Sequence, residues 1–327
     1  MLLRLVNYVD KRADSDAFHV GLLNDDGVLD LNRLKDACGE VKSACDCPEC
    51  WKSALGIVTC PSCLEAAQGY ADWFEAQSTT VRDDLTVARD TVRLLSPVPH
   101  PGKVLCLAQN FPEHAAEANR HITHSGDSVA DAMTPHVFLK PSSNTVRGDG
   151  DVIPITPTAQ FIDYEAEVVV VIGKTGKYIK TEEAAEYIAG VTCMNDVSER
   201  KLKIWERKDE RPWDNFFDWL NGKWMDGFAP MGPCLVPAKD IDVNNLTVRG
   251  YVNGELRQQD NTSAMFHSAA ASIEYISHFM TLEAGDVLAL GTPAGVGIAL
   301  GHKLVPGDVV KVEVEGVGTL TNEVVAE

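Results

Sequence analysis

Two acidic residues stand at the start of a strongly apolar segment, where carboxylates can bind a metal ion. Glu165 and Glu167 precede a run of valines that predicts a β-strand. Side chains two positions apart share one strand face, so both carboxylates point the same way. An isolated pair of this kind would simply be a solvated face, but here both faces of the segment are apolar. Two buried like charges are costly without a cation between them, so we expect a hard metal ion with oxygen ligands.

Asp196 is the candidate third ligand, because it follows the apolar segment 190–194 just as the two glutamates precede theirs. Sites are commonly assembled where strands end. The alternative is that Asp196 caps a helix that begins at Val197, which is a frequent role of aspartate. Spacing does not separate these two interpretations.

Cysteines form a second candidate metal site. Six of the nine cysteines fall between residues 38 and 63 and include two Cys-x-x-Cys knuckles. Nine residues separate the knuckles, a short but sterically possible spacing for tetrahedral zinc. We therefore expect a structural Zn²⁺ ion, with disulfides and unligated thiols as the alternatives. Its ligands would be Cys47, Cys50, Cys60 and Cys63.

The elements before residue 96 predict a small α+β unit. Short strands are expected over residues 2–9, 19–23 and 28–31, and an amphipathic helix over residues 64–77. The proline-rich segment 96–102 then disfavours both helix and central strand. We therefore place a domain boundary there, with a small N-terminal domain over 1–96 and a catalytic domain over 97–327.

Strand signals dominate after the boundary. Apolar segments predict strands over residues 103–108, 137–139, 165–172, 191–194 and 286–290, and Asn253-Gly254 predicts a hairpin turn. A second hairpin is expected over residues 310–325, where apolar and polar residues alternate around a glycine turn. Antiparallel strands with few helices favour a β-rich α+β fold over a doubly wound sheet.

Composition excludes several classes of function. The 327 residues carry a formal net charge of −19, which would repel nucleic acid, and no basic stripe with interleaved aromatics is present. No apolar run is long enough to span a membrane, and residues 1–9 do not resemble a signal peptide. We expect a cytoplasmic protein that has neither nucleic acid nor membrane as a partner.

An ordered set of short motifs from about residue 102 to residue 327 resembles the fumarylacetoacetate hydrolase family. Each motif alone is weak, but the ordered set is specific. The motifs are QNFPEHAAE at 109–117, DYEAE at 163–167, NDVSER at 195–200, GKWMDGF at 222–228, VNGE at 252–255 and GTPAGVG at 291–297.

The resemblance implies a mixed β-roll core, usually dimeric, with Mg²⁺, Mn²⁺ or Ca²⁺ held by the three acids. It also implies a dyad of His114 and Glu117 that activates water, and a Lys223 that polarises a small oxo-acid substrate. Arg200 and Thr292 would lie near substrate oxygens. The alternatives for Lys223 and Thr292 are a surface lysine and an ordinary turn residue.

The dyad also has a physical basis. Pro112 suits an early helical position, and residues three apart then share a helix face, so His114 and Glu117 can touch. A carboxylate beside an imidazole raises its basicity and fixes its tautomer, as a general base near neutral pH requires. The alternative is an exposed pair that contributes a few tenths of a kcal/mol.

Three segments depart from the family pattern. Lys201 and Lys203 replace residues that are common after the Asn-Asp-Val-Ser motif, and Lys203 is a candidate ligand of a substrate carboxylate or else part of a solvated face. Residues 204–222 form an aromatic-rich insertion that would wall the pocket or line a dimer interface, with buried packing as the default. Residues 121–136 carry three histidines and are expected to form a lid, with a metal site as the alternative.

Three functions are consistent with these residues. The first is a metal-dependent hydrolase of aromatic-compound catabolism that cleaves a carbon–carbon bond in a β-diketo acid or acylpyruvate. The second is a 2-oxo-acid decarboxylase or keto–enol isomerase on the same scaffold. The third is a non-catalytic zinc-knuckle interaction protein, against which the buried acids argue, since a scaffold does not need them.

Overall fold

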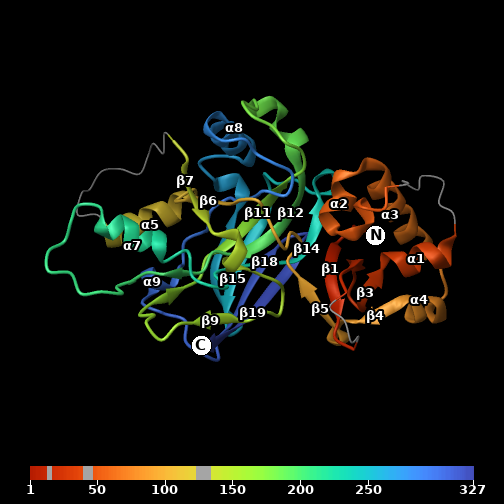
Figure 1. Ribbon diagram of the computed structural model, residues 1–327, viewed down its shortest axis with the longest axis horizontal. Coiled ribbons are helices and arrows are strands. Elements are labelled where there is room, and N and C mark those ends of the chain that lie inside the picture. The colour runs from red at the N-terminus through yellow and green to blue at the C-terminus, as the bar shows by residue number, and fades with distance from the viewer. Residues whose placement is uncertain (13–16, 40–46, 123–133) are drawn as a thin grey trace.

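The structure is a computed structural model that describes residues 1–12, 17–39, 47–122 and 134–327. Strands form the central sheets of the molecule (Figure 1). The strands are β1 (Leu5–Asp10), β2 (His19–Leu23), β3 (Gly27–Asp30), β4 (Thr86–Ala88), β5 (Val92–Leu95), β6 (Val104–Ala108), β7 (His136–Lys140), β8 (Val146–Arg147), β9 (Ile153–Ile155), β10 (Ile162–Asp163), β11 (Ala166–Ile172), β12 (Ile188–Asn195), β13 (Ser198–Glu199), β14 (Ala229–Pro237), β15 (Thr247–Val252), β16 (Glu255–Asn261), β17 (Val287–Ala289), β18 (Val309–Val314) and β19 (Gly318–Ala326).

Helices cover the sheets and fill their connections. The α-helices are α1 (Leu31–Cys38), α2 (Ala54–Thr59), α3 (Pro61–Glu75), α4 (Thr79–Leu85), α5 (Pro112–Ile122), α6 (Ser142–Thr145), α7 (Asp214–Asn221), α8 (Ala269–Phe279) and α9 (Gly297–Leu300). Short 3-10 turns include η1 (Cys50–Lys52) and η3 (Thr181–Tyr187). The predicted strand-rich α+β fold is confirmed.

One large sheet organises the chain. Its strand order is β4-β3-β2-β1-β14-β12-β11-β17-β6-β7, with β5 beside β1 and β8 beside β14. Strand β11 lies in the middle and pairs antiparallel with both β12 and β17. A second sheet has the order β16-β15-β18-β19-β9 and contains both predicted hairpins.

Both faces of β11 are covered, as its valine run predicts. Val168 and Val170 pack in a core with the second sheet and α8, whereas Val169 and Val171 pack with the N-terminal helices. A strand buried on both faces holds its ends rigidly, because every side chain is packed. The acids beside its first residue are therefore carried on a fixed support.

The N-terminal strands extend the same sheet, since β1 pairs with β14 through Leu5 and Leu235. Figure 1 shows helices α1 to α4 gathered around the N-terminus, with α5 and α7 on the opposite side of the molecule. The boundary proposed near residue 96 stays a prediction. Most of the proposed lid, residues 123–133, lies outside the described residues.

Candidate active site

The three predicted acids come together at one end of the β11–β12 pair. Ala166 pairs with Asn195 in an antiparallel register, so the start of β11 meets the end of β12. Glu165, Glu167 and Asp196 are buried, and each offers a carboxylate oxygen that lies within 4.8 Å of the other two. The predicted grouping of the acids is confirmed, and this triad of oxygen donors could hold a hard metal ion.

Asp196 is not a helix cap, so that alternative is wrong. The chain after Asp196 forms β13, and the amide of Val197 donates to the carbonyl of Phe228 rather than starting a helix. The Asp196 side chain instead forms ion pairs with Lys140 and Lys223. Contacts with residues distant in the chain therefore determine the role of Asp196, for which the local sequence allowed two interpretations.

Buried cations surround two of the acids. The Nζ atom of Lys223 lies 2.8 Å from Glu165 and 2.6 Å from Asp196. Arg200 pairs with Glu165 and, at 2.8 Å, with Asp163. Burial alone would raise the pKa of Glu165, but Lys223 and Arg200 hold it well below its usual range. Glu165 is thus ionised and ready to act as a ligand.

Glu167 has a different environment from its two neighbours. Its Oε2 atom accepts a hydrogen bond from the Gly291 amide at 2.9 Å, and among the described residues it forms no ion pair. Burial, together with the charges of Asp196 and Glu165, raises its pKa well above the usual glutamate value. Glu167 is thus a buried carboxylate that forms no ion pair and lies beside two other acids. A divalent cation bound by all three would supply the missing positive charge.

The predicted dyad forms on α5. His114 Nδ1 lies 3.5 Å from Glu117 Oε2, and both side chains are buried. Glu117 also accepts from the Gly295 amide at 3.1 Å, which fixes the carboxylate in place. The Gly291 amide donates to Glu167 and the Gly295 amide donates to Glu117, so one loop contacts both the triad and the dyad. The two side chains lie next to each other, and their role as a base stays a prediction.

Thr292 lies directly beside the triad strand. Its hydroxyl donates to the Ala166 carbonyl at 3.0 Å and accepts from Gln258 Nε2 at 2.8 Å. Gln258 also accepts from the Ala166 amide at 3.0 Å, so it fixes the position of the backbone next to Glu165.

Lys203, by contrast, is exposed and pairs with Glu206 at 3.4 Å, and none of its contacts within the described ranges involves the triad.

Lys140 and Gln258 are site residues that sequence reasoning missed. Lys140 ends the apolar strand β7 and is buried, and its ammonium also donates to the Val197 carbonyl at 2.9 Å. Burial lowers the pKa of Lys140. The available signal was its position, since it follows an apolar segment just as Asp196 does. Nothing in the local sequence marks Gln258.

Most aromatic side chains of the insertion are exposed, whereas we expected them to be buried. Trp205 is 85% exposed and Trp213 is 68% exposed, and Phe216 and Phe217 are exposed as well. Trp219 is the exception, because its ring packs edge-on against Phe138. The ammonium of Lys223 lies 5.1 Å from the Phe138 ring and 5.9 Å from the Trp219 ring. Trp219 of the insertion therefore lies beside Lys223 and forms one side of the site.

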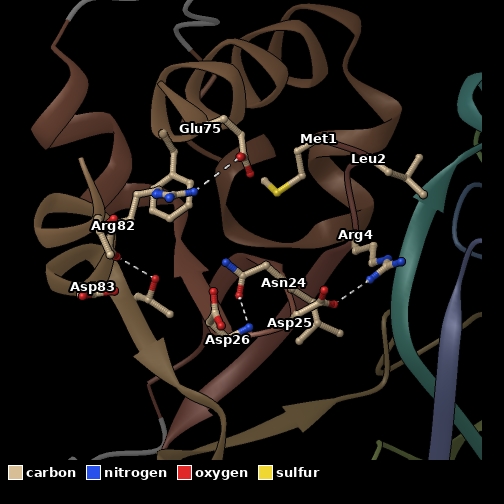
Figure 2. Close-up of a pocket in the computed structure, with 13 residues that line it drawn as sticks. Met1, Leu2, Arg4, Asn24, Asp25, Asp26, Glu75, Arg82 and Asp83 are labelled. Carbon is tan, nitrogen blue, oxygen red and sulfur yellow. Dashed lines mark hydrogen bonds and ion pairs between the residues drawn. The ribbon is translucent and has the colours of Figure 1, made fainter. Parts of the chain in front are cut away.

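A separate pocket of about 350 Å³ lies in the N-terminal region (Figure 2). Its charged side chains face one another, with Arg82 3.8 Å from Glu75 and Arg4 3.8 Å from Asp25. None of its lining residues belongs to the triad or the dyad.

No helix in the described ranges is long and apolar enough to cross a membrane.

Comparison with known proteins identifies the family. The model of the fumarylacetoacetate (FAA) hydrolase C-terminal family matches residues 103–325. The chain belongs to the fumarylacetoacetate hydrolase family. A mitochondrial oxaloacetate tautomerase from Xenopus laevis is 38% identical over 254 residues, which cover 76% of this chain and 74% of the relative. The human mitochondrial oxaloacetate tautomerase is 36% identical over 261 residues, covering 79% and 77% of the two chains.

Solved members of the fumarylacetoacetate hydrolase family share the architecture. A fumarylacetoacetate hydrolase from Exiguobacterium antarcticum is 29% identical, with a TM-score of 0.70 over 98% of this chain and 100% of its own. A 2-hydroxyhepta-2,4-diene-1,7-dioate isomerase from Mycobacterium marinum is 27% identical, with a TM-score of 0.66 over 99% of both chains. The predicted family is confirmed, and its similar members include hydrolases, isomerases and a tautomerase.

Proposed function

We propose that this chain is a divalent-metal-dependent enzyme that interconverts the keto and enol forms of a small 2-oxo dicarboxylate of the oxaloacetate type. The observation that carries the proposal is a buried carboxylate triad with a His–Glu dyad beside it. The relatives named as oxaloacetate tautomerases support this reaction over the carbon–carbon hydrolysis that the sequence first suggested.

A bound metal ion would make the site compatible with an anionic substrate. Five buried acids meet three buried or nearly buried bases, which leaves two excess negative charges when all are ionised. A divalent cation would offset that excess, so the loaded site would no longer repel a carboxylate-bearing molecule. The charged residues are Asp163, Glu165, Glu167, Asp196, Glu117, Lys140, Lys223 and Arg200.

The triad would hold Mg²⁺ or Mn²⁺, and a bound ion would supply Lewis-acid stabilisation of negative charge on the substrate oxygens. His114 would move the proton. Contact of its Nδ1 with Glu117 favours the tautomer protonated there, which leaves Nε2 to take a proton from the carbon between the two carbonyl groups. The ammonium of Lys223 would orient a substrate oxygen, and the proton returns to oxygen to give the enol.

A direct assay tests the proposal. Disappearance of enol-oxaloacetate, followed by its ultraviolet absorbance, should accelerate with protein and Mg²⁺ and fall to the uncatalysed rate with EDTA. The Glu167→Gln variant should show the same loss without chelator. Full activity in the chelated protein would refute the metal-dependent mechanism.

Hydrolysis of an acylpyruvate is the second candidate, because the His114–Glu117 dyad could equally activate water. Parallel assays on oxaloacetate and on a panel of acylpyruvates distinguish the two. A higher kcat/KM for carbon–carbon cleavage, with both products identified, would assign this chain as a hydrolase.

A further inference from the structure

Three cysteines of the N-terminal region gather at one point, with a fourth beside one of them, away from the carboxylate triad in sequence and in chemistry. The sulfur atoms of Cys50, Cys60 and Cys63 all lie within 4.8 Å of one another. The Sγ atom of Cys47 lies 3.0 Å from that of Cys50. The two Cys-x-x-Cys knuckles therefore meet in space.

The sulfurs of Cys50, Cys60 and Cys63 are close enough to share a single tetrahedral metal ion. Zinc binds thiolates at about 2.3 Å, which puts neighbouring sulfurs roughly 3.8 Å apart, so the Cys47 and Cys50 sulfurs would move apart on binding. A disulfide needs a separation of about 2.0 Å, so Cys47 and Cys50 are not bonded to each other at 3.0 Å. An iron–sulfur cluster spreads its thiolates around several iron atoms and requires a wider arrangement.

Local backbone structure holds both knuckles in place. In the first, the Cys50 amide donates to the Cys47 carbonyl at 3.3 Å, which closes a turn. In the second, Cys60 is the N-cap of α3 and Pro61 is its first residue, so Cys63 lies in the first turn. The amino end of a helix favours a thiolate over a thiol, because its dipole attracts negative charge.

A close approach of helix α2 positions the first knuckle. A Cβ atom on Gly56 would lie 2.5 Å from the Cys50 carbonyl oxygen, so only glycine allows this contact. Helix α2 joins the two knuckles and packs against α3. The sulfurs therefore converge through packed backbone elements rather than through exposed loops alone.

We propose that the N-terminal region binds one structural zinc ion through the thiolates of Cys47, Cys50, Cys60 and Cys63. Four protein ligands leave no open position, so this ion does not take part in catalysis. Thiolates select zinc, whereas the carboxylate triad selects a harder ion, so one chain carries two unlike metal sites.

The zinc ion would hold the N-terminal helices on the large sheet. Helix α2 packs on β1, β12 and β14, and its Ala54 amide donates to the Asn7 side chain at 2.8 Å. The site ties η1 to α3 across this helix. Zinc binding therefore contributes to the stability of a layer that covers β12, the strand that leads to Asp196.

Elemental analysis of reduced protein, purified with neither added metal nor chelator, tests the site. We expect about one zinc per chain. Cys60→Ser should lower the zinc content to near zero, whereas the matched Cys38→Ser, in the same region but outside the cluster, should retain it. Cobalt exchanged into the natural chain gives a test without a variant, since tetrathiolate coordination produces intense sulfur-to-cobalt absorption.

Three results would overturn the proposal. The first is natural, reduced protein that contains no zinc and gives no thiolate–cobalt absorption. The second is iron with acid-labile sulfide, which would indicate a cluster. The third is zinc that persists in Cys60→Ser and is lost in Glu167→Gln, which would place the ion in the carboxylate triad. These readouts are independent of catalysis, so the proposed reaction can fail while the zinc site stands.

Discussion

Glu167 differs from the other two acids of the triad because it forms no ion pair within the described residues, and the charge of Lys223 offsets its burial only in part. An acid whose pKa is raised on folding keeps its proton to higher pH in the folded state than in the unfolded state. In metal-free protein, Glu167 therefore contributes stability at low pH. That contribution is lost as pH rises from the ordinary glutamate value through the raised one.

This environment predicts an unusual stability change for Glu167→Gln. Without metal, the variant should melt at a higher temperature than the natural protein, and the gain should grow from acidic toward alkaline pH. Mg²⁺ should raise the melting temperature of the natural protein but not of the variant. Differential scanning calorimetry at several pH values, with and without Mg²⁺, measures both effects. A variant that is stabilised by Mg²⁺ as strongly as the natural chain would contradict the role of Glu167 as a ligand.

His114 and Glu117 act as one base in the proposed reaction. His114→Ala should lower kcat by about 10²–10⁴-fold, which is the range for general acid–base catalysis. Glu117→Gln should lower kcat by a similar factor, and the double variant should lose little more than either alone. Steady-state kinetics of the three variants at saturating Mg²⁺ measure this coupling. Losses that multiply in the double variant would show that the two residues act separately.

The triad could be predicted from sequence because acids rarely stand at the ends of fully apolar strands. Lys140 also follows an apolar segment, but it was missed because the sequence does not distinguish a lysine that snorkels to water from one that lies buried beside Asp196. The two interpretations of Asp196 differed in whether a helix begins at Val197. That choice depended on Phe228, far away in the chain.

At the scale of elements, turns bring the site residues to the ends of β11 and β12. Gly291 follows β17 with a φ of +96°, and its amide donates to Glu167. A Cβ atom there would lie 2.9 Å from that of Asn110, which precedes the dyad helix. Gly291 therefore contacts both Glu167 of the triad and the residue that precedes the helix of the dyad.

Gly291→Ala should therefore disturb the site as well as the turn. We expect a loss of stability above the 1–2 kcal/mol or so typical of a left-handed alanine, because of the added clash. Mg²⁺ affinity and kcat should fall as well. The matched control is Gly254→Ala, which has a φ of +81° and open space around its Cβ position. The control should lose about 1–2 kcal/mol and keep its Mg²⁺ affinity. Equal Mg²⁺ affinities in the two variants, measured by calorimetric titration, would contradict this role for Gly291.

Most strands could be predicted because their apolar periodicity is local, and β2 over His19–Leu23 has the predicted bounds. Strand β14 was missed although it is buried along its whole length. Pro230 and Pro233 lie within it, and prolines ordinarily argue against a central strand. Here the packing of β14 between β1 and β12 overrides the local signal.

At the scale of the whole molecule, a homodimer remains a prediction from the family resemblance. The exposed aromatic residues of the insertion, Trp205 and Trp213 among them, are the candidate contact, since such residues are enriched at interfaces. Sedimentation equilibrium should give twice the chain mass, and Trp213→Ser should weaken the association. A natural protein that sediments as a monomer at micromolar concentration would refute the prediction.

A shared core determines how the molecule unfolds. Leu5 and Ile57, before the proposed boundary, belong to the same buried cluster as Val169 and Met194 after it. Because these side chains cover the face of β11 that carries Glu167, neither part can lose its partner without exposing a large apolar surface. We therefore expect a single unfolding transition, even if residues 1–96 form a domain by sequence.

Ile57→Ala tests this cooperativity. Truncating a fully buried isoleucine costs about 2–5 kcal/mol, and the whole transition should move to lower temperature as one peak. Val81→Ala is the matched control, since Val81 lies in the same region and is 38% exposed, and it should change stability by less than about 0.5 kcal/mol. Scanning calorimetry of both variants, with Mg²⁺ present, separates the outcomes. Two peaks, of which Ile57→Ala shifts one while the Mg²⁺-stabilised peak stays in place, would show that the N-terminal region unfolds on its own.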